Sequence, residues 1–261
     1  MPLTDILVAT DDHRRATLLF RVAAGYASRH GARLTGILYT GQPLFAPPRD
    51  HEEEAMRSFS LIAAERGVES RWINGGRKGV GPDLLFHQSR STGLVIAGQP
   101  PEEGHKGGHP ELPERLILNA GRPVLIIPYA GSFTTFGERI LVAWSDGRES
   151  ARALHDALPL LKMANKVRLV GMVDSDEDDT SPDRFDAINS FLERCGIDVR
   201  PDELFAPDFP LADLLLNRAA DEGSDLLVMG AFGHTPGSRP VMGRIAKHIL
   251  KHMTLPVLMA H

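Results

Sequence analysis

Short apolar runs alternate with longer amphipathic stretches along the first half of the chain. The runs are rich in Val, Ile and Leu, and the stretches between them space their apolar residues as helices do, so the pattern predicts alternating strands and helices. The expected strands are residues 6–9, 34–39, 68–73, 94–97 and 124–127, and the expected helices are 14–29, 52–66, 82–91 and 111–119. This order predicts a parallel sheet covered by helices.

The second half of the chain repeats the first. Four segments recur in the same order with nearly the same spacing: ILVATDD at 6–12 as ILVAWSD at 140–146, RLTGIL at 33–38 as RLVGMV at 168–173, LVIAG at 94–98 as LLVMG at 226–230, and PVLIIP at 123–128 as PVLMA at 256–260. The sequence therefore predicts an α/β protein made of two tandem copies of one five-stranded parallel-sheet domain, residues 1–132 and 137–261. A linker containing Gly, Ser and Thr, 129–138, joins them.

Each copy ends in an apolar strand, which follows Pro123 in the first copy and Pro256 in the second. A strand at the end of the unit is expected at a sheet edge, and exposed apolar edges are usually paired or covered. We therefore expect the two final strands to meet and form an internal pseudo-dimer. A homodimer of the whole chain is a further expectation.

Composition and charge narrow the function. The chain is 42% hydrophobic and 24% charged, with a net charge of −5, and it has no long basic run of the kind that nucleic-acid binders carry. Cys195 is the only cysteine, so no intrachain disulfide forms. The N-terminus has charges where a signal peptide needs an apolar core, and no apolar run is long enough to span a membrane. We expect a cytoplasmic protein that binds neither nucleic acid nor membrane.

A glycine-rich segment, MGAFGHTPGSRPVMGR at 229–244, follows the expected buried strand 225–229. Open α/β sheets bind ligands at the carboxyl ends of their strands. The next expected helix, from Val241 or Gly243 to Met253, would direct its free N–H groups to the same edge, where glycines let the backbone approach a phosphate. From the spacing alone, a permissive turn is as good an account as a phosphate cradle.

At this point the sequence resembles the universal stress protein family in its tandem two-domain form. Nucleotide-binding members carry G-x2-G-x9-G-(S/T) after the fourth strand, and Gly230, Gly233 and Gly243 keep that spacing. The segments ILVAWSDGRESARALHDALPLLK at 140–162 and KHILKHMTLPVLMAH at 247–261 also resemble the family's opening and ending. The resemblance implies a Rossmann-like fold of the adenine nucleotide α-hydrolase type in each copy.

The resemblance also implies a site for ATP or a related adenine nucleotide, with or without Mg²⁺, in the second copy. Adenine would lie near Met172, with Ala143 and Met229 as walls, and the phosphates would rest on amides of the glycine loop, with His234 at its entrance. The implied nucleotide-binding residues are Ala143, Ser145, Asp146, Met172, Met229, Gly230, Gly233, His234, Gly243, Arg244 and Ile245.

The sequence departs from the family pattern at three places. Arg244 stands where binders have Ser or Thr, so its guanidinium either joins the phosphates or fills their space. Binders carry an Asp after the first strand; the first copy has Asp11 there, whereas the second has Ser145, with Asp146 one residue late. In the first copy, Pro101 replaces the second motif glycine and removes an N–H, so we expect that site to be nonfunctional or to bind something else.

Two functions follow. The first is a stress-response regulatory protein that binds an adenine nucleotide in the C-terminal domain, and the alternative is a nucleotide-free stress protein acting through protein contacts. The sequence contains neither a G-x4-GK(S/T) loop nor a G-x-S-x-G elbow, so it gives no catalytic residue, and at most slow ATP hydrolysis is expected. His248 and His252 share a helix face but lack a third ligand, so no metal site is predicted.

Overall fold

The computed structural model describes residues 3–41, 49–76, 79–100, 108–133, 135–145, 147–173, 185–205, 210–231 and 242–261. The chain divides into two compact units, unit 1 from Met1 to Thr135 and unit 2 from Phe136 to His261. Among the described residues, no helix is both long and apolar enough to cross a membrane.

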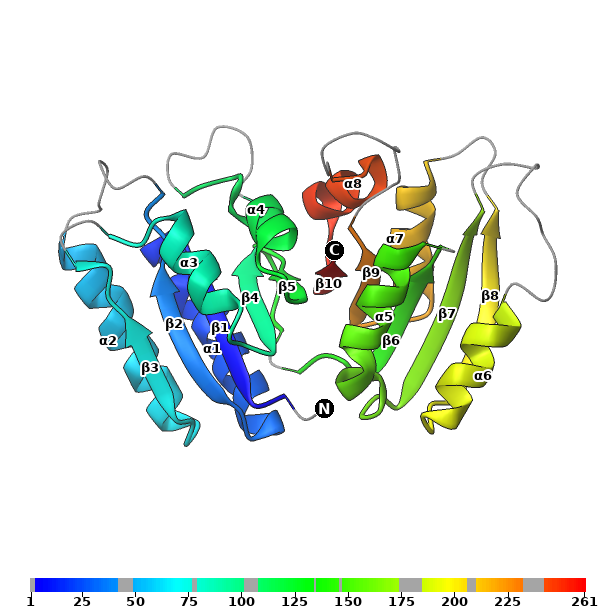
Figure 1. Ribbon diagram of the computed structural model, residues 1–261, viewed down its shortest axis with the longest axis horizontal. Helices are drawn as coiled ribbons and strands as arrows, with labels where there is room; N and C mark the ends of the chain where they lie inside the picture. The colour runs from blue at the N-terminus through cyan, green and yellow to red at the C-terminus, as the bar shows by residue number, and fades with distance from the viewer. Residues whose placement is uncertain are drawn as a thin grey trace. The chain divides into compact units, whose positions relative to one another are not determined.

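Unit 1 alternates strands and helices in the predicted order (Figure 1). Its strands are β1 (Asp5–Thr10), β2 (Arg33–Leu38), β3 (Ser70–Ile73), β4 (Leu94–Gly98) and β5 (Val124–Ile127). Its helices are α1 (His13–His30), α2 (Arg49–Glu65), α3 (Pro82–Ser89) and α4 (Leu112–Asn119). Every strand and helix expected from the apolar pattern is therefore present, with ends that differ by at most a few residues.

Unit 2 repeats this arrangement. Its strands are β6 (Arg139–Trp144), β7 (Lys166–Val173), β8 (Val199–Phe205), β9 (Leu226–Gly230) and β10 (Val257–Ala260). Its helices are α5 (Arg148–Leu161), α6 (Asp186–Arg194), α7 (Leu211–Asp221) and α8 (Arg244–His252). The helix expected after the glycine loop is α8, and it begins directly after the last motif glycine.

The strands of each unit run parallel and follow the same order. In unit 1 the order is β3-β2-β1-β4-β5, and in unit 2 it is β8-β7-β6-β9-β10. The first strand of each unit is therefore central: Ile6 of β1 pairs with Leu34 of β2 and with Leu94 of β4, and Ile140 of β6 has the corresponding neighbours in β7 and β9. The predicted tandem parallel-sheet α/β fold is confirmed.

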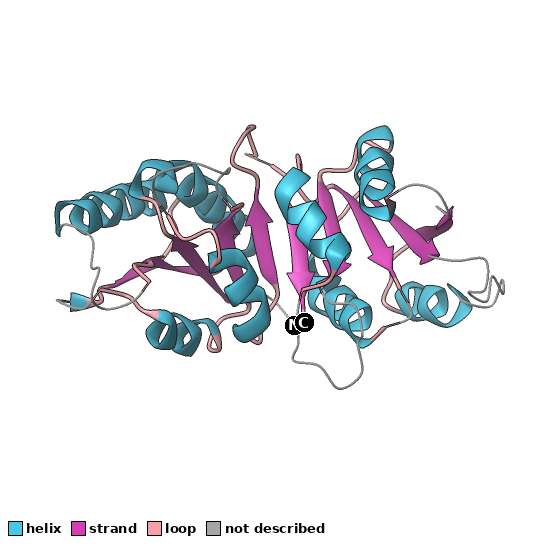
Figure 2. Cartoon of the chain, turned by 90° about the horizontal axis from the view of Figure 1, so that it is seen from above, coloured by secondary structure: helices cyan, strands magenta, loops and turns pink. Residues whose placement is uncertain are grey.

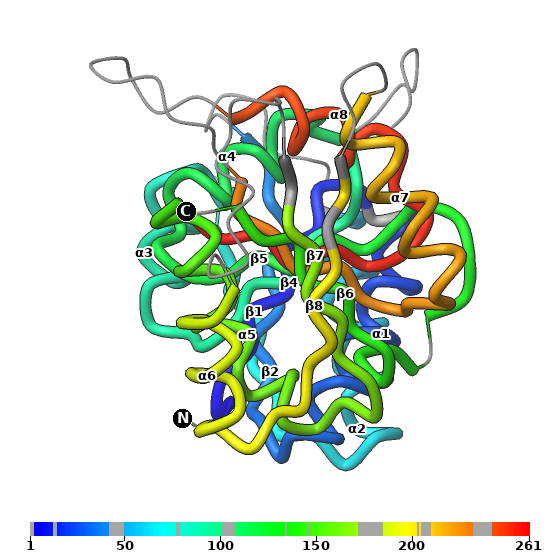
Figure 3. The backbone as a smooth tube through the Cα atoms, turned by 90° about the vertical axis from the view of Figure 1, so that its right-hand side faces the viewer, coloured from blue at the N-terminus to red at the C-terminus, as the bar shows by residue number. Residues whose placement is uncertain are grey.

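Helices cover both faces of each sheet, as the view from above in Figure 2 makes clear. In unit 1, α1 and α2 pack against each other, and in unit 2, α7 packs against α8; Figure 3 shows the latter pair side by side. With helices on both sides, strands such as β1, β4 and β5 are buried and are nearly continuous apolar runs, which is typical of parallel sheets. The outer strand β3 is more exposed.

The glycine that recurs in the second strand of each unit makes room for an aromatic ring. A Cβ at Gly36 would collide with the rings of Trp72 and Phe59, and one at Gly171 would collide with the ring of Phe185. The same position in each copy thus packs a large side chain directly on the strand backbone. This shared packing explains why the repeat RLTGIL and RLVGMV keeps its glycine.

Asp225 fixes the entry of the chain into unit 2. Its Oδ1 accepts hydrogen bonds from the backbone N–H groups of Gly137 at 3.0 Å and Arg139 at 2.9 Å, and its Oδ2 accepts one from Glu138 at 3.2 Å. One carboxylate therefore satisfies three consecutive amides at the start of β6. Because Asp225 directly precedes β9, it also ties the beginnings of two adjacent strands together.

Candidate functional site

The carboxyl end of β9 and the start of α8 bring together the two ends of the glycine motif in unit 2. Gly230 is the last residue of β9, and Gly243 is the N-cap of α8. The N–H of Gly243 donates a hydrogen bond to the carbonyl oxygen of Ala231 at 3.1 Å. The chain between them, residues 232–241, lies outside the described residues, and with it lie Gly233 and His234.

The first motif glycine is required by packing. A Cβ at Gly230 would lie 2.8 Å from the amide nitrogen of Ser150 and 2.9 Å from the carbonyl carbon of Glu149. Both are backbone atoms in the first turn of α5, which cannot move aside as a side chain could. Gly230 therefore lets α5 approach β9 closely, and this requirement holds whether or not a ligand binds.

The amino end of α8 has donors that the helix itself leaves without partners. Gly243 makes no side-chain capping hydrogen bond, and the first N–H groups of a helix have no acceptor within it. Arg244 is exposed and makes no hydrogen bond or ion pair with any residue that the structure describes, and Ile245 follows it in the first turn. These amides and the guanidinium together are suited to an anion.

The loop after β6 is held by Ser150 of α5. Its Oγ donates a hydrogen bond to the carbonyl oxygen of Ala143 at 3.3 Å and accepts one from the N–H of Ser145 at 3.0 Å. Ser145 itself is exposed at the end of β6, where the resemblance implies an acidic residue in binders. Asp146, the other candidate for that role, lies outside the described residues.

A second helix also begins at this edge and brings charge with it. The N-cap of α5 is Gly147, which makes no side-chain capping hydrogen bond. In the first turn, the Glu149 side chain is buried, and its Oε1 lies 2.8 Å from Nε of the exposed Arg148. The carboxylate of Glu149 is thus partly neutralised by Arg148, and Arg244 is a further cation among the described residues at this edge.

The residues expected around adenine are strand residues of the same unit. Ala143 and Met229 are buried, with 1% and 2% of their surfaces exposed. The backbone of Met172 pairs with Leu204 in the ladder between β7 and β8, but the placement of its side chain lies outside what the structure describes. The described members of the predicted set therefore lie on neighbouring strands and on α8 at one edge of the sheet.

The corresponding edge of unit 1 is closed by its own chain. The N–H of His109 donates a hydrogen bond to Oδ2 of Asp11 at 2.5 Å, and the His109 ring packs edge-on against Tyr39 with centroids 5.0 Å apart. Gly108 has a positive φ of 74°, and a Cβ there would lie 2.9 Å from Oδ2 of Asp11. Gly108 and His109, just before α4, therefore contact the carboxylate of Asp11. Asp11 is the residue that aligns with the acidic residue of nucleotide-binding family members.

Burial also changes the acidity of Asp11. Desolvation raises the pKa of this carboxyl above its ordinary value of 3.8, although the hydrogen bond from the His109 N–H and the nearby Arg15 charge oppose the shift. The Asp11 carboxyl already accepts a hydrogen bond from the protein's own backbone, the N–H of His109.

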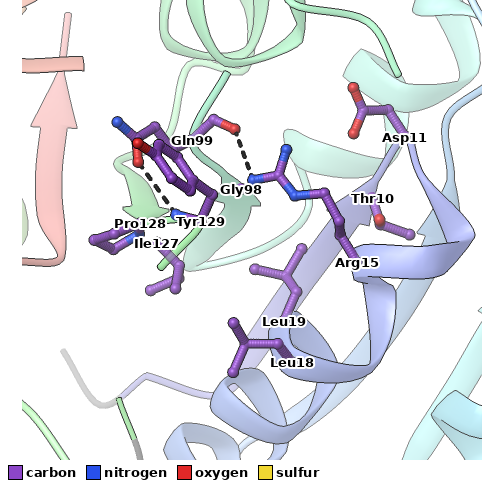
Figure 4. Close-up of a pocket in the computed structure, with 10 residues that line it drawn as sticks. All are labelled: Thr10, Asp11, Arg15, Leu18, Leu19, Gly98, Gln99, Ile127, Pro128 and Tyr129. Carbon is purple, nitrogen blue, oxygen red and sulfur yellow. Dashed lines mark hydrogen bonds between the residues drawn. The ribbon is translucent and has the colours of Figure 1, made fainter. Parts of the chain in front are cut away.

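A cavity of about 240 Å³ lies at the same end of unit 1, between α1 and the ends of β4 and β5 (Figure 4). Arg15 projects into it and donates a long hydrogen bond, 3.4 Å, to the carbonyl oxygen of Gln99, while its guanidinium carbon lies 5.9 Å from the centre of the Tyr129 ring. The cavity is lined by Thr10, Asp11, Arg15, Leu18, Leu19, Gly98, Gln99, Ile127, Pro128 and Tyr129.

Sequence reasoning missed this cavity. Arg15 is one of several arginines on an amphipathic helix, and Tyr129 falls in a stretch interpreted as linker. The only available signal was the mismatch between copies: Arg15 aligns with Glu149 in the repeat. A Cβ at Gly98 would meet no atom within 4 Å, in contrast to its counterpart Gly230. In unit 2, α5 fills this space. In unit 1, the corresponding helix α1 leaves it open.

Comparison with known proteins places this architecture. Residues 210–261 match the model of the universal stress protein family. A universal stress protein from Archaeoglobus fulgidus aligns with 98% of this chain and 97% of its own, at 13% identity and a TM-score of 0.72. A functionally unknown protein from Pseudomonas aeruginosa PAO1 aligns with 99% of this chain and 92% of its own, at 18% identity and a TM-score of 0.63. No curated protein matches the chain in sequence.

Both units therefore have the Rossmann-like fold of universal stress proteins. The resemblance to the universal stress protein family is confirmed, by the family model over residues 210–261 and by the fold over nearly the whole chain. A shorter match, at 21% identity over 48% of this chain with a TM-score of 0.37, is a universal stress protein from Archaeoglobus fulgidus in complex with dAMP.

Proposed function

We propose that this chain is a stress-response regulatory protein that binds ATP or a related adenine nucleotide in unit 2. The observation that carries the proposal is the hydrogen bond between Gly243 and Ala231, which holds the start of α8 beside the end of β9. With this contact, the segment that matches the universal stress protein model presents an uncapped helix N-terminus at the ligand-binding edge of the sheet.

Charge at this edge also supports the proposal. The amino ends of α5 and α8 both lie near Gly230, and each contributes partial positive charge. Arg148 offsets the buried carboxylate of Glu149, and the guanidinium of Arg244 has no ion-pair partner among the residues that the structure describes. A polyphosphate would be attracted to this arrangement, whereas a neutral ligand would gain nothing from it.

The roles in the proposed site follow from placement. The amides of Gly243, Arg244 and Ile245 and the Arg244 guanidinium would hold phosphates, and the strand residues Ala143, Met172 and Met229 would border the base. Gly230 would act through packing, since its lack of a side chain lets α5 reach β9. Gly233, His234, Ser145 and Asp146 stay proposed members on the strength of the sequence alone.

The experiment is calorimetric titration of the full chain with ATP, with and without Mg²⁺. If Arg244 joins the phosphates, Arg244→Glu should weaken ATP binding at least about tenfold, a cost of roughly 1.4 kcal/mol. If Arg244 fills the phosphate space instead, Arg244→Ser should tighten binding. Arg21→Glu is the matched control, because Arg21 is an exposed residue of α1 and the charge change is the same.

The absence of both heat and a thermal shift at millimolar nucleotide would overturn this proposal. Mass spectrometry of the protein under native conditions gives an independent test, since a nucleotide carried through purification would be identified by its mass.

A nucleotide-free protein acting through protein contacts is the second candidate. It is favoured by Gly230, because the close approach of α5 gives this motif glycine a structural reason that needs no ligand. Both candidates predict that Gly230→Ala lowers stability, so stability alone does not separate them. Binding does: the second candidate predicts no nucleotide affinity in the wild type or in any Arg244 variant.

Two wider expectations from the sequence stay proposals. One is an internal pseudo-dimer through the final strands of the two units, with a homodimer of whole chains as a further form. The other is a cytoplasmic location. Sedimentation of the full chain tests the homodimer, and paired cysteine substitutions in 124–127 and 257–260 test the internal contact.

A further inference from the structure

The unit 1 cavity combines a cation with an apolar wall. Arg15 enters from α1, and Leu18 and Leu19 of the same helix lie on one side of its guanidinium in Figure 4, with Ile127, Pro128 and Tyr129 from the end of β5 on another. A guanidinium carries five N–H donors. Among the residues that the structure describes, the Arg15 side chain makes one hydrogen bond, the long contact to Gln99, so it retains donors for a ligand.

The cavity wall opposite Arg15 is fixed. Gln99 has 3% of its surface exposed, and its Oε1 accepts a hydrogen bond from the N–H of Tyr129 at 3.1 Å. This bond ties the end of β5 to the residue that follows β4. The acceptor for Arg15 and the aromatic ring beside it are thus held by the same residue, which preorganises the site.

Size and charge limit what the cavity can hold. Its volume of about 240 Å³ is below the range of roughly 300–1,000 Å³ that is usual for drug-sized ligands. Asp11 also lines the cavity, although its Oδ2 is bonded to the His109 N–H. The nearby negative charge of Asp11 disfavours a dianion such as a phosphate monoester, so a single negative charge suits Arg15 best.

The cavity lies at the edge of unit 1 that corresponds to the nucleotide site implied for unit 2, since it includes Asp11 and Gly98, the counterparts of Ser145 and Gly230, but its other walls differ. In unit 1 the residues before α4 close onto Asp11 and Tyr39 through His109, whereas the cavity lies beside α1 and β5. A ligand in this cavity would use Arg15, for which unit 2 has Glu149 at the aligned position.

We propose that unit 1 contains a binding site for a compact organic monocarboxylate with an apolar body. The carboxylate pairs with the Arg15 guanidinium, in the fork geometry that suits arginine. The body lies against Leu18, Leu19 and Ile127 and the ring of Tyr129. Unit 1 is then a small-acid sensor that differs in ligand from unit 2.

The probe is benzoate, titrated into the full chain and followed by calorimetry and by saturation-transfer NMR. Benzoate should bind, and benzyl alcohol, which has a similar body without the charge, should bind at least about tenfold more weakly. Arg15→Gln should weaken benzoate binding by at least the same factor. Arg21→Gln, an exposed residue on the same helix, should leave it unchanged.

A second variant keeps the test independent of Arg15. Gly98 lines the cavity and a Cβ there meets no atom within 4 Å, so Gly98→Val should occupy the cavity and reduce benzoate binding while circular dichroism stays that of the wild type. ATP should not displace benzoate. No benzoate binding at millimolar concentration, or equal binding to wild type and Arg15→Gln, would overturn the proposal, and either result leaves the ATP titration of unit 2 unaffected.

Discussion

A Cβ placed on Gly230 would lie 2.8 Å from the backbone nitrogen of Ser150. That separation is shorter than real Cβ contacts, so α5 and β9 are as close as a glycine allows. The same strand position in unit 1, Gly98, has open space around it. Two aligned glycines therefore have different structural requirements.

Gly230→Ala should destabilise the protein by about 1–3 kcal/mol, because α5 must shift to accept the added methyl group. Gly98→Ala is its matched control. The control should be neutral or stabilising by up to about 1 kcal/mol, since the added Cβ enters open space and alanine restricts the unfolded chain. Urea unfolding followed by circular dichroism measures both, and equal losses in the two variants would contradict the packing argument.

Asp225→Ala should cost about 1.5–3 kcal/mol, the range for hydrogen bonds to a charged group, because three amides at residues 137–139 lose their acceptor. Asp225→Asn should cost less, since its one carbonyl oxygen can still serve Gly137 and Arg139. Asp221→Ala, at the exposed end of α7, is the control and should cause no loss. Hydrogen exchange at residues 137–139 should rise in the alanine variant before exchange elsewhere in β6.

The sequence predicted the order and nature of the strands and helices because buried parallel strands are continuous apolar runs and their covering helices are amphipathic. The same pattern occurs in both copies of the internal repeat, which strengthened the prediction of the fold. The local features of the sites were harder to predict. The collision at Gly230, the triple acceptor role of Asp225 and the closure of His109 onto Asp11 all depend on residues that are distant in sequence. No periodicity encodes such contacts.

Stability should depend on pH through Asp11. Burial raises the pKa of this carboxyl in the folded state, so the folded protein holds its proton more tightly than the unfolded chain does. Below the ordinary value of 3.8 both states are protonated and there is no penalty. As pH rises through the folded pKa, the buried charge destabilises the protein.

Asp11→Asn should therefore be more stable than the wild type at neutral pH, by a margin that shrinks as the pH is lowered. Asparagine keeps an oxygen that can accept the His109 N–H. Thermal melts of both proteins from neutral to acidic pH measure this difference in stability. Asp198→Asn, at an exposed position, is the control. A margin that is constant with pH would mean that Asp11 does not titrate in this way.

Glu222 should show the opposite dependence. One of its oxygens, Oε2, lies 2.6 Å from Nζ of Lys166 and 3.2 Å from Nε of Arg168. The hydrogen bond from Lys166 is the main reason that the pKa of Glu222 is lowered in the folded protein, with Arg168 adding to it. The contribution of Glu222 to the stability of the folded protein is therefore present above its pKa in the unfolded chain, and it is lost as the pH falls through its pKa in the folded protein.

Glu222→Gln should lower stability at neutral pH by no more than about 1 kcal/mol, because these groups are partly exposed. The loss should decrease in high salt and disappear in acid. Urea unfolding at low and high ionic strength checks this, and a salt-independent loss would point to packing instead.

The central position of β1 and β6 has a consequence for synthesis on the ribosome. The β2 partner of Ile6, Leu34, is translated soon after it, whereas its β4 partner, Leu94, is translated much later. Ile140 likewise pairs with Leu226 only after most of unit 2 has been translated. Such non-local pairing is slow to form and leaves strand edges open in the meantime. During most of the translation of each half, its middle strand is therefore paired on one side only. The open edge of that strand is where a holding chaperone would bind.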